Sequence, residues 1–193
     1  MISTHIDSSR SPGAASPAVS EWKEKLRDGS SVLIRPIHPG DEDIERKFIE
    51  RLSAQSRRYR FLGEIAAPSA KLVNQFTHPD PVHDAAFVAL IADGAEKREI
   101  GVARFSAGSD MSRCECAIAV SDDWQGKGLA TIMMRHLIDI ARQRDFKSMY
   151  SIDASDNEAM RELAEHLGFE RRHDPDDATQ VIHTLDLRAA TAG

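Results

Sequence analysis

Residues 125–128 form a turn whose composition suits an anion-binding site. The turn reads Gln125-Gly126-Lys127-Gly128, and it separates a strand-like apolar run, Ala117–Val120, from a helical pattern over Leu129–Arg144. The first backbone N–H groups of a helix have no partner within the helix, and the helix dipole adds positive potential at that end. A phosphate or pyrophosphate is therefore the ligand that this turn predicts.

Glu115 is the candidate acid–base residue. It is the only charged residue between Cys114 and Val120, and strand alternation puts it on one face with Ala117 and Ala119. These two small side chains leave room for a ligand, and apolar surroundings raise the pKa of a carboxyl group and make it a better base. A glutamate at a solvent-facing strand position explains the same pattern without chemistry, so both interpretations stay open here.

Two other groups of residues could in principle bind a metal. The loop Thr77–Asp84 holds two His and two Asp residues, but no helix or strand fixes their spacing, which favours a solvated loop. Cys114 and Cys116 lie two apart on one strand, about 6.5–7 Å from each other, which is awkward for a disulfide. No further cysteine completes a metal site. We expect two reduced core cysteines and no metal.

Hydrophobic periodicity indicates the elements that position these residues. Strands are expected over residues 32–37, 85–92, 99–105, 113–120, 148–153 and 180–187, and helices over 41–52, 55–62, 69–76, 129–144 and 157–167. Residues 21–29 fit either a short strand or a helix. Pro36 favours an edge position for its strand. The last helix is predicted to open with a capping box over Ser155–Glu158 and to end at Gly168.

This order of elements predicts the fold class. An antiparallel meander leads into a β-α-β unit, and another helix and a last strand follow. We therefore expect an α/β (α+β) protein with a mixed, mostly antiparallel central sheet of about six or seven strands, flanked by helices. Residues 21–188 are predicted to form one domain. Residues 1–20, which are rich in Ser, Ala and Pro, are predicted to form a disordered tail, with a second short tail over 189–193.

Composition limits the expected partners and cellular location. The net charge of −6 argues against a nucleic-acid partner. No apolar run approaches a membrane span, and the N-terminus lacks the pattern of a signal peptide. With only two cysteines, the expected location is the cytoplasm. A homodimer remains open.

Two nucleotide-binding motifs fail at this turn. A Walker loop requires Ser or Thr after its lysine, whereas Gly128 follows Lys127. A dinucleotide fingerprint requires a third glycine, where this chain has Thr131, and it follows its strand directly. Here the spacer Ser121–Gln125 intervenes.

A third pattern fits: Gln125-Gly126-Lys127-Gly128-Leu129-Ala130 resembles the pyrophosphate motif of the GCN5-related N-acetyltransferases (GNAT superfamily). Asn157, Leu163 and Gly168-Phe169 resemble a downstream segment of that superfamily, and the resemblance covers about residues 32–187. It implies a GNAT-like fold and acetyl-CoA as acyl donor. The implied cofactor-binding residues are Ala119, Val120, Gln125, Gly126, Lys127, Gly128, Leu129, Ala130, Thr131 and Asn157. Among these, Ala119 and Val120 would supply backbone hydrogen bonds to the pantetheine arm.

The N-terminal half is similar to one group within the superfamily. Residues 34–41 and 51–61 resemble the catalytic domain of bacterial Pat-type protein lysine acetyltransferases. That resemblance implies a protein lysine as acceptor and Glu115 as general base. It leaves the general acid unassigned, because the superfamily's tyrosine position is Ala164. His166 is expected at the surface and Tyr150 in the core. Arg57, Arg58 and Arg60 are expected either to border the acceptor cleft or to form a solvated basic helix face.

The predicted function is therefore an acetyl-CoA-dependent N-acetyltransferase acting on an amine, most plausibly a protein lysine, with Glu115 as base. A small-molecule amine acetyltransferase and a non-catalytic acyl-CoA-binding regulatory domain are the alternatives.

Overall fold

The computed structural model describes residues 21–63, 67–108 and 111–188, so the two predicted tails lie outside the described residues. The strands in these ranges are β1 (Trp22–Lys25), β2 (Ser31–Pro36), β3 (Asp84–Asp93), β4 (Glu96–Ala107), β5 (Arg113–Val120), β6 (Ser148–Ala154), β7 (Glu170–His173) and β8 (Gln180–Asp186). The helices are α1 (Glu42–Arg51), α2 (Ala54–Phe61), α3 (Ala70–Thr77), α4 (Leu129–Gln143) and α5 (Glu158–His166), with 3-10 turns η1 (Pro39–Asp41) and η2 (Asp122–Trp124).

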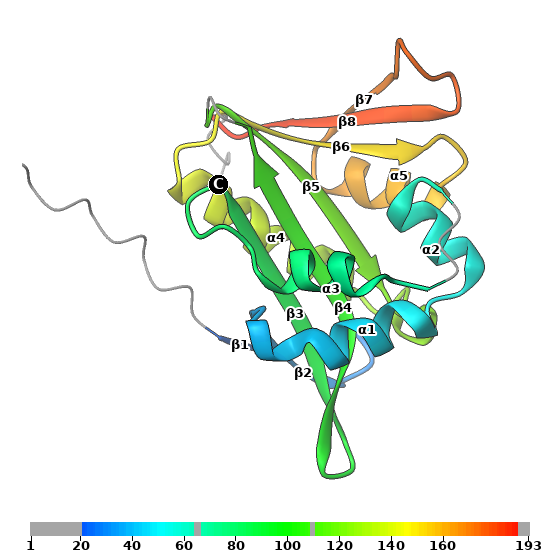
Figure 1. Ribbon diagram of the computed structural model, residues 1–193. Coiled ribbons are helices and arrows are strands. Elements are labelled where there is room, and N and C mark those ends of the chain that lie inside the picture. The colour runs from blue at the N-terminus through cyan, green and yellow to red at the C-terminus, as the bar shows by residue number, and fades with distance from the viewer. Residues whose placement is uncertain (1–20, 64–66, 109–110, 189–193) are drawn as a thin grey trace, which may run out of the picture.

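The strands form one sheet in the order β1-β2-β3-β4-β5-β6-β8-β7. Every neighbouring pair is antiparallel except β5 and β6, which are parallel. Helix α4 packs on one face of the sheet, and α1 and α3 lie on the other (Figure 1). The mixed, mostly antiparallel sheet flanked by helices confirms the predicted class, although its eight strands exceed the expected six or seven.

Apolar side chains fill both faces of the sheet. The α4 face buries Phe105, Met133, Leu137 and Met149 among others, and the α1 face buries Phe48, Ile49, Val88 and Val102. Fully burying a side chain of this size contributes roughly 1.5–3 kcal/mol relative to leaving it exposed. The stripes that the sequence shows on α1 and α4 are therefore the surfaces that hold these helices to the sheet.

Strands β5 and β6 separate after three residue pairs. Their pairing joins Arg113–Glu115 to Ser148–Tyr150 and stops there. Beyond that point β5 remains paired with β4 up to Val120, while β6 remains paired with β8 up to Ala154. The two strands diverge in Figure 1, so one edge of β5 is open in the middle of the sheet.

The side chains of β5 alternate between the two faces. Cys114, Cys116 and Val120 belong to the core on the α4 face, whereas Ala119 packs against the core on the α1 face. Because successive strand residues point to opposite faces, Glu115 lies on the α1 face with Ala117 and Ala119. The predicted shared face of these three residues is thus present.

Four local predictions need correction or completion. The open choice for residues 21–29 resolves as strand β1, and strand β7 was not expected because its residues are all exposed. Strand β2 is internal, not at an edge. Pro36 is accommodated because the pairing of β1 with β2 ends at Ile34.

Helix α5 is capped by Asn157, whose side chain accepts a hydrogen bond from the Met160 N–H, and not by Ser155. Gly168 follows this helix at φ 84°, as predicted.

None of the helices described is both long enough and apolar enough to cross a membrane.

Candidate functional site

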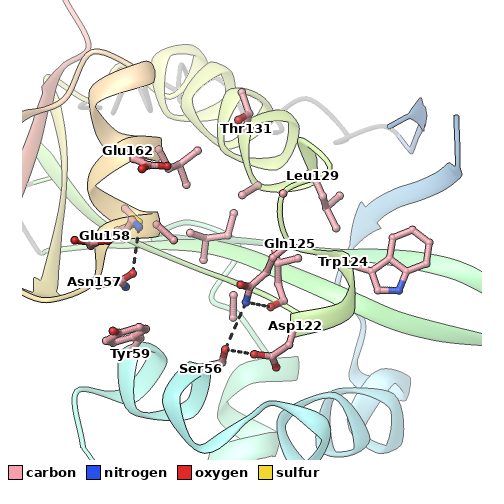
Figure 2. Close-up of a pocket in the computed structure, with 18 of the residues that line it drawn as sticks. Ser56, Tyr59, Asp122, Trp124, Gln125, Leu129, Thr131, Asn157, Glu158 and Glu162 are labelled. Atoms are coloured by element: carbon pink, nitrogen blue, oxygen red, sulfur yellow. Dashed lines mark hydrogen bonds between the residues drawn. The ribbon is translucent and has the colours of Figure 1, made fainter. Parts of the chain in front are cut away.

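A cavity of about 670 Å³ opens beside the free edge of β5. Its walls come from the end of β5, the loop before α4, the start of α4, and helices α2 and α5 (Figure 2). Nine of the ten predicted cofactor-binding residues line it: Ala119, Val120, Gln125, Gly126, Gly128, Leu129, Ala130, Thr131 and Asn157. The tenth, Lys127, is not among the lining residues, and neither is Glu115.

The loop before α4 presents backbone donors to the cavity. Gly126 and Gly128 have φ values of 72° and 89°, a left-handed conformation that favours glycine. Gly128 is the N-cap residue of α4, and no side chain caps this helix. The N–H groups of the first turn are therefore available to an anion, with the positive end of a fifteen-residue helix behind them.

The open edge of β5 presents further backbone groups. The N–H of Ser121 donates to the carbonyl of Ile100 in β4 at 2.9 Å, so the carbonyl of Val120, in the same peptide unit, points away from β4. Gln125 Nε2 donates to that carbonyl at 3.1 Å. In an extended strand, N–H and C=O directions alternate between neighbouring residues. Val120 and Ile118 thus turn their backbone groups toward the cavity.

Ala119 contributes differently from the prediction. Its carbonyl oxygen lies 3.3 Å from the position that a Cβ would take on Gly101 in β4, so its backbone faces β4. Ala119 lines the cavity without offering that carbonyl, whereas the backbone of Ile118, which also lines the cavity, faces the gap.

Helix α2 is fastened to the loop by a carboxylate. Asp122 accepts hydrogen bonds from the N–H and hydroxyl of Ser53, at 2.9 and 2.7 Å, and from the Ser56 hydroxyl at 2.8 Å. Ser53 also caps α2 by accepting from the Ser56 N–H at 3.1 Å. Burial alone would raise the pKa of Asp122, but the hydrogen bonds from Ser53 and Ser56 outweigh it and lower the pKa below 3.8.

The other end of α2 reaches the start of α5. Arg58 forms an ion pair with Asp156 at 2.5 Å, and the Tyr59 hydroxyl donates to the Asp156 carbonyl at 3.2 Å. Arg57 donates to the Leu52 carbonyl at 2.6 Å. Helix α2 is therefore held at its start by Asp122, as Figure 2 shows for Ser56, and near its end by Asp156.

Lys127 faces away from the site. Its ammonium group lies 3.1 Å from the Asp28 carboxylate and 4.2 Å from the centre of the Trp124 ring. Hydrogen bonds from Ser30 and from Lys127 lower the pKa of Asp28 to about 2, so this carboxylate is ionised near neutral pH. Arg27, which the sequence analysis did not select, lines the cavity instead. No local sequence pattern indicates that Arg27 and Asp28 lie beside the loop before α4.

Glu115 belongs to the last residue pair that joins β5 to β6, so the unpaired stretch of the β5 edge begins at this residue. It is exposed, so the apolar surroundings expected for it are absent. Its carboxylate accepts a hydrogen bond from the Tyr150 hydroxyl at 3.3 Å. Partial burial, and then the neighbouring Glu115 charge, raise the pKa of Tyr150, so this hydroxyl stays protonated and donates. Tyr150 is half-buried and not part of the core.

Arg60 connects the cavity with this end of β5. Its guanidinium lies beside the stacked rings of Phe61 and Phe76, 5.3 and 5.1 Å from their centres. Burial and the neighbouring Arg104 charge lower the pKa of Arg60 to about 10, and Glu115 acts in the opposite direction. Arg57 and Arg60 are thus half-buried, whereas Arg58 is exposed and paired with Asp156.

The structure also places the other residues that the sequence offered as candidates. Ala164 is fully buried, and His166 is exposed while lining the cavity. Cys114 and Cys116 are buried and unpaired, and burial raises the pKa of the Cys114 thiol to about 12. In the 77–84 loop, Asp80 accepts hydrogen bonds from the Val82 N–H and from His83. Among the described residues, no group of three His, Cys, Asp or Glu side chains could hold a metal.

Known proteins share this arrangement. Residues 54–169 match the family described as the acetyltransferase (GNAT) family. The chain is 48% identical to Acetyltransferase PA5475 of Pseudomonas aeruginosa over 94% of this chain and 97% of that protein. It is 30% identical to Acetyltransferase Pat of Mycolicibacterium smegmatis over 75% of this chain, and it spans 43% of that longer protein. The crystal structure of the GNAT domain of S. lividans PAT superposes with a TM-score of 0.79 at 27% identity, covering 86% of this chain and 96% of that one.

The family match covers most of the residues that line the cavity beside the divided sheet. The chain belongs to the GNAT acetyltransferase family. It is an N-acetyltransferase, and acetyl-CoA is its acyl donor.

Proposed function

We propose that this enzyme transfers the acetyl group of acetyl-CoA to the side-chain amine of a protein lysine, with Glu115 as general base. One observation carries the proposal: Glu115 lies where the open edge of β5 ends, so a donor extended along that edge would bring its thioester toward this carboxylate. The resemblance of residues 34–41 and 51–61 to Pat-type protein lysine acetyltransferases supports the acceptor, and the chain is similar to Pat of M. smegmatis and to the GNAT domain of S. lividans PAT.

The donor fits the cavity in one direction. The pyrophosphate would lie on the first-turn amides of α4, beside Gly126 and Gly128. The pantetheine arm would run along β5 and bond with the backbone of Ile118 and Val120 in place of a strand. In this orientation the Ile118 N–H, which faces the gap between the phosphate loop and Glu115, can donate to the thioester carbonyl and stabilise the negative charge that develops on its oxygen.

The chemistry then requires the acceptor nitrogen to lose two protons, one before the attack and one as the amide forms. A lysine ammonium has a pKa near ~10.4 and must lose a proton before its nitrogen can attack. Glu115 takes that proton, directly or through a water molecule, because it is the exposed carboxylate at this end of β5. The amine nitrogen bonds to the acetyl carbon and the carbon–sulfur bond breaks, and the nitrogen gives up its second proton to the departing thiolate or to water as the neutral amide forms. The CoA thiolate leaves without a dedicated acid, since thiols of this kind have a pKa near ~8.5.

A panel of acceptors tests the proposal. The enzyme is incubated with acetyl-CoA and either lysine-bearing proteins or small amines, while thiol release and acetyl-lysine are measured. Turnover on protein lysines supports the proposal. Turnover on small amines alone would show the acceptor to be wrong, and tight acetyl-CoA binding with no acceptor turned over would favour a regulatory domain.

Glu115→Gln tests the base. We expect acetyl-CoA affinity to stay within twofold and kcat to fall by about 10²- to 10⁴-fold, the usual contribution of a general base. Glu165→Gln is the matched control, because Glu165 is exposed on α5 and does not line the cavity. An unchanged kcat in Glu115→Gln would exclude Glu115 as the base.

A further inference from the structure

The turn between β1 and β2 is docked on the loop that precedes α4. The N–H of Arg27 donates to the Lys127 carbonyl at 3.1 Å. On the next residue, the Asp28 carboxylate pairs with the Lys127 ammonium at 3.1 Å. A hairpin far away in sequence therefore holds the predicted phosphate loop at two points, and it neutralises the only lysine of that loop.

The Arg27 side chain lies over the loop glycine at the start of α4. A Cβ on Gly128 would meet Nε, Cγ and Cδ of Arg27 at 3.3, 3.5 and 3.6 Å. Arg27 also lines the cavity. Within the described parts of the chain, its guanidinium has no hydrogen bond or ion pair with another side chain. This cation is thus held beside the loop amides with its donors unused.

Carboxylates outnumber cations around the cavity. The lining carboxylates are Asp122, Asp153, Asp156, Glu158 and Glu162, whereas the lining Arg and Lys residues are Arg27 and Arg60. The Arg60 guanidinium packs beside the stacked rings of Phe61 and Phe76, near the Glu115 end of the site. A polyanionic donor therefore meets one arginine at the loop, and that arginine is Arg27.

We propose that Arg27 binds a phosphate group of acetyl-CoA and is the cation that selects the phosphorylated donor in this enzyme. A guanidinium can give two parallel hydrogen bonds to phosphate oxygens, which a lysine cannot do. Arg27 lies outside the segment 54–169 that matches the family, in the turn that follows β1. The proposal concerns the donor and does not depend on which amine is acetylated.

The role of Arg27 is tested by measuring donor binding in the absence of an acceptor amine. Dissociation constants of the full chain are measured by calorimetry for acetyl-CoA, its 3′-dephospho form and acetyl-pantetheine, which has no phosphate. Arg27→Gln should weaken acetyl-CoA binding by about tenfold, the range of one partly exposed charge-assisted contact, and leave acetyl-pantetheine within twofold. Arg27→Lys should recover part of the loss. Lys25→Gln, which removes an exposed charge from the same hairpin, should change neither.

Each outcome decides the proposal. A loss that disappears with the dephospho form assigns Arg27 to the 3′-phosphate, and a loss that persists assigns it to the pyrophosphate; both support the contact. A loss below twofold for acetyl-CoA would overturn it. An equal loss for acetyl-CoA and acetyl-pantetheine would also overturn it, because it would show that Arg27 only supports the fold of the loop.

Discussion

Two carboxyl groups are buried together on the α1 face of the sheet. Glu45 is 1% exposed and Glu99 is fully buried, with the Arg104 guanidinium 3.8 Å from Glu45. Burial, and then the Glu45 charge, raise the pKa of Glu99 well above 4.5. The folded protein therefore keeps a proton on Glu99 at pH values where an unfolded chain has lost it.

This raised pKa predicts a pH-dependent stability. Between the ordinary pKa of a glutamate and the raised one, the folded state binds more protons, so the free energy of unfolding falls as pH rises, by at most ~1.4 kcal/mol per pH unit. Glu99→Gln should flatten this slope and be more stable than the wild type at pH 7–8. Urea unfolding from pH 5 to 8 measures it. Glu96→Gln, on the exposed part of β4, is the control, and an unaltered slope in Glu99→Gln would contradict the assignment.

The two loop glycines predict a matched pair of variants. Both have left-handed φ values, so alanine costs each about 1–2 kcal/mol of strain. A Cβ at Gly126 meets nothing within 4 Å, whereas a Cβ at Gly128 meets Arg27 Nε at 3.3 Å. Gly128→Ala should therefore weaken acetyl-CoA binding severalfold more than Gly126→Ala at a similar loss of Tm. Equal affinities in the two variants would argue against a role for this contact.

At the scale of elements, helix α2 depends on polar contacts more than on a buried stripe. None of its residues is fully buried. It is held at its start by Asp122 and at its end by the Arg58–Asp156 pair. Since α2 forms one wall of the cavity, these contacts determine the width of the site.

Asp122→Ala should release the start of α2. Three hydrogen bonds are lost, which should cost on the order of 1–2 kcal/mol of stability and speed amide exchange in α2. Because the pKa of Asp122 is lowered on folding, its contribution is present above pH ~4 and is lost as pH falls further. Asp123→Asn is the neighbouring control, since Asp123 contacts Arg98 and not α2. Unchanged exchange in α2 would show that the helix is held elsewhere.

Elements with a buried stripe could be predicted from the sequence, and contacts between distant segments could not. The bounds of α1 and α4 agree with the prediction within one or two residues because their apolar periodicity is the signal for burial. Strand β7 reads Glu-Arg-Arg-His and pairs with β8 through its backbone alone, so it gives no such signal. Lys127 matched a local motif, but Asp28, one hundred residues earlier, decides where its ammonium points.

At the scale of the whole molecule, the sheet consists of two parts. Strands β1–β5 form one part and β6–β8 the other, and the three residue pairs between β5 and β6 join them. The cavity lies in the gap, and Glu115 lies at its closed end. The position of the site was predictable from the loop motif. The division of the sheet could be recognised only from the register of the strands.

The open edge predicts an exchange pattern. The amides of Ile118 and Val120, which face the gap, should exchange with solvent faster than that of Ala119, which faces β4. Saturating acetyl-CoA should slow them selectively. Hydrogen exchange followed by NMR measures both effects, and uniform protection along β5 in the free protein would contradict the assigned backbone directions.

The gap in the sheet also couples folding to metabolism. A donor that completes the sheet binds only the folded chain, so it adds RT ln(1 + [L]/Kd) to the free energy of unfolding, about 2.7 kcal/mol at one hundred times Kd. For a fold whose two parts share three residue pairs, that is a large fraction of a typical total of 5–15 kcal/mol. The lifetime of the protein in the cell should therefore follow the CoA thioester concentration, and a starved cell would hold less of the enzyme without any change in its synthesis.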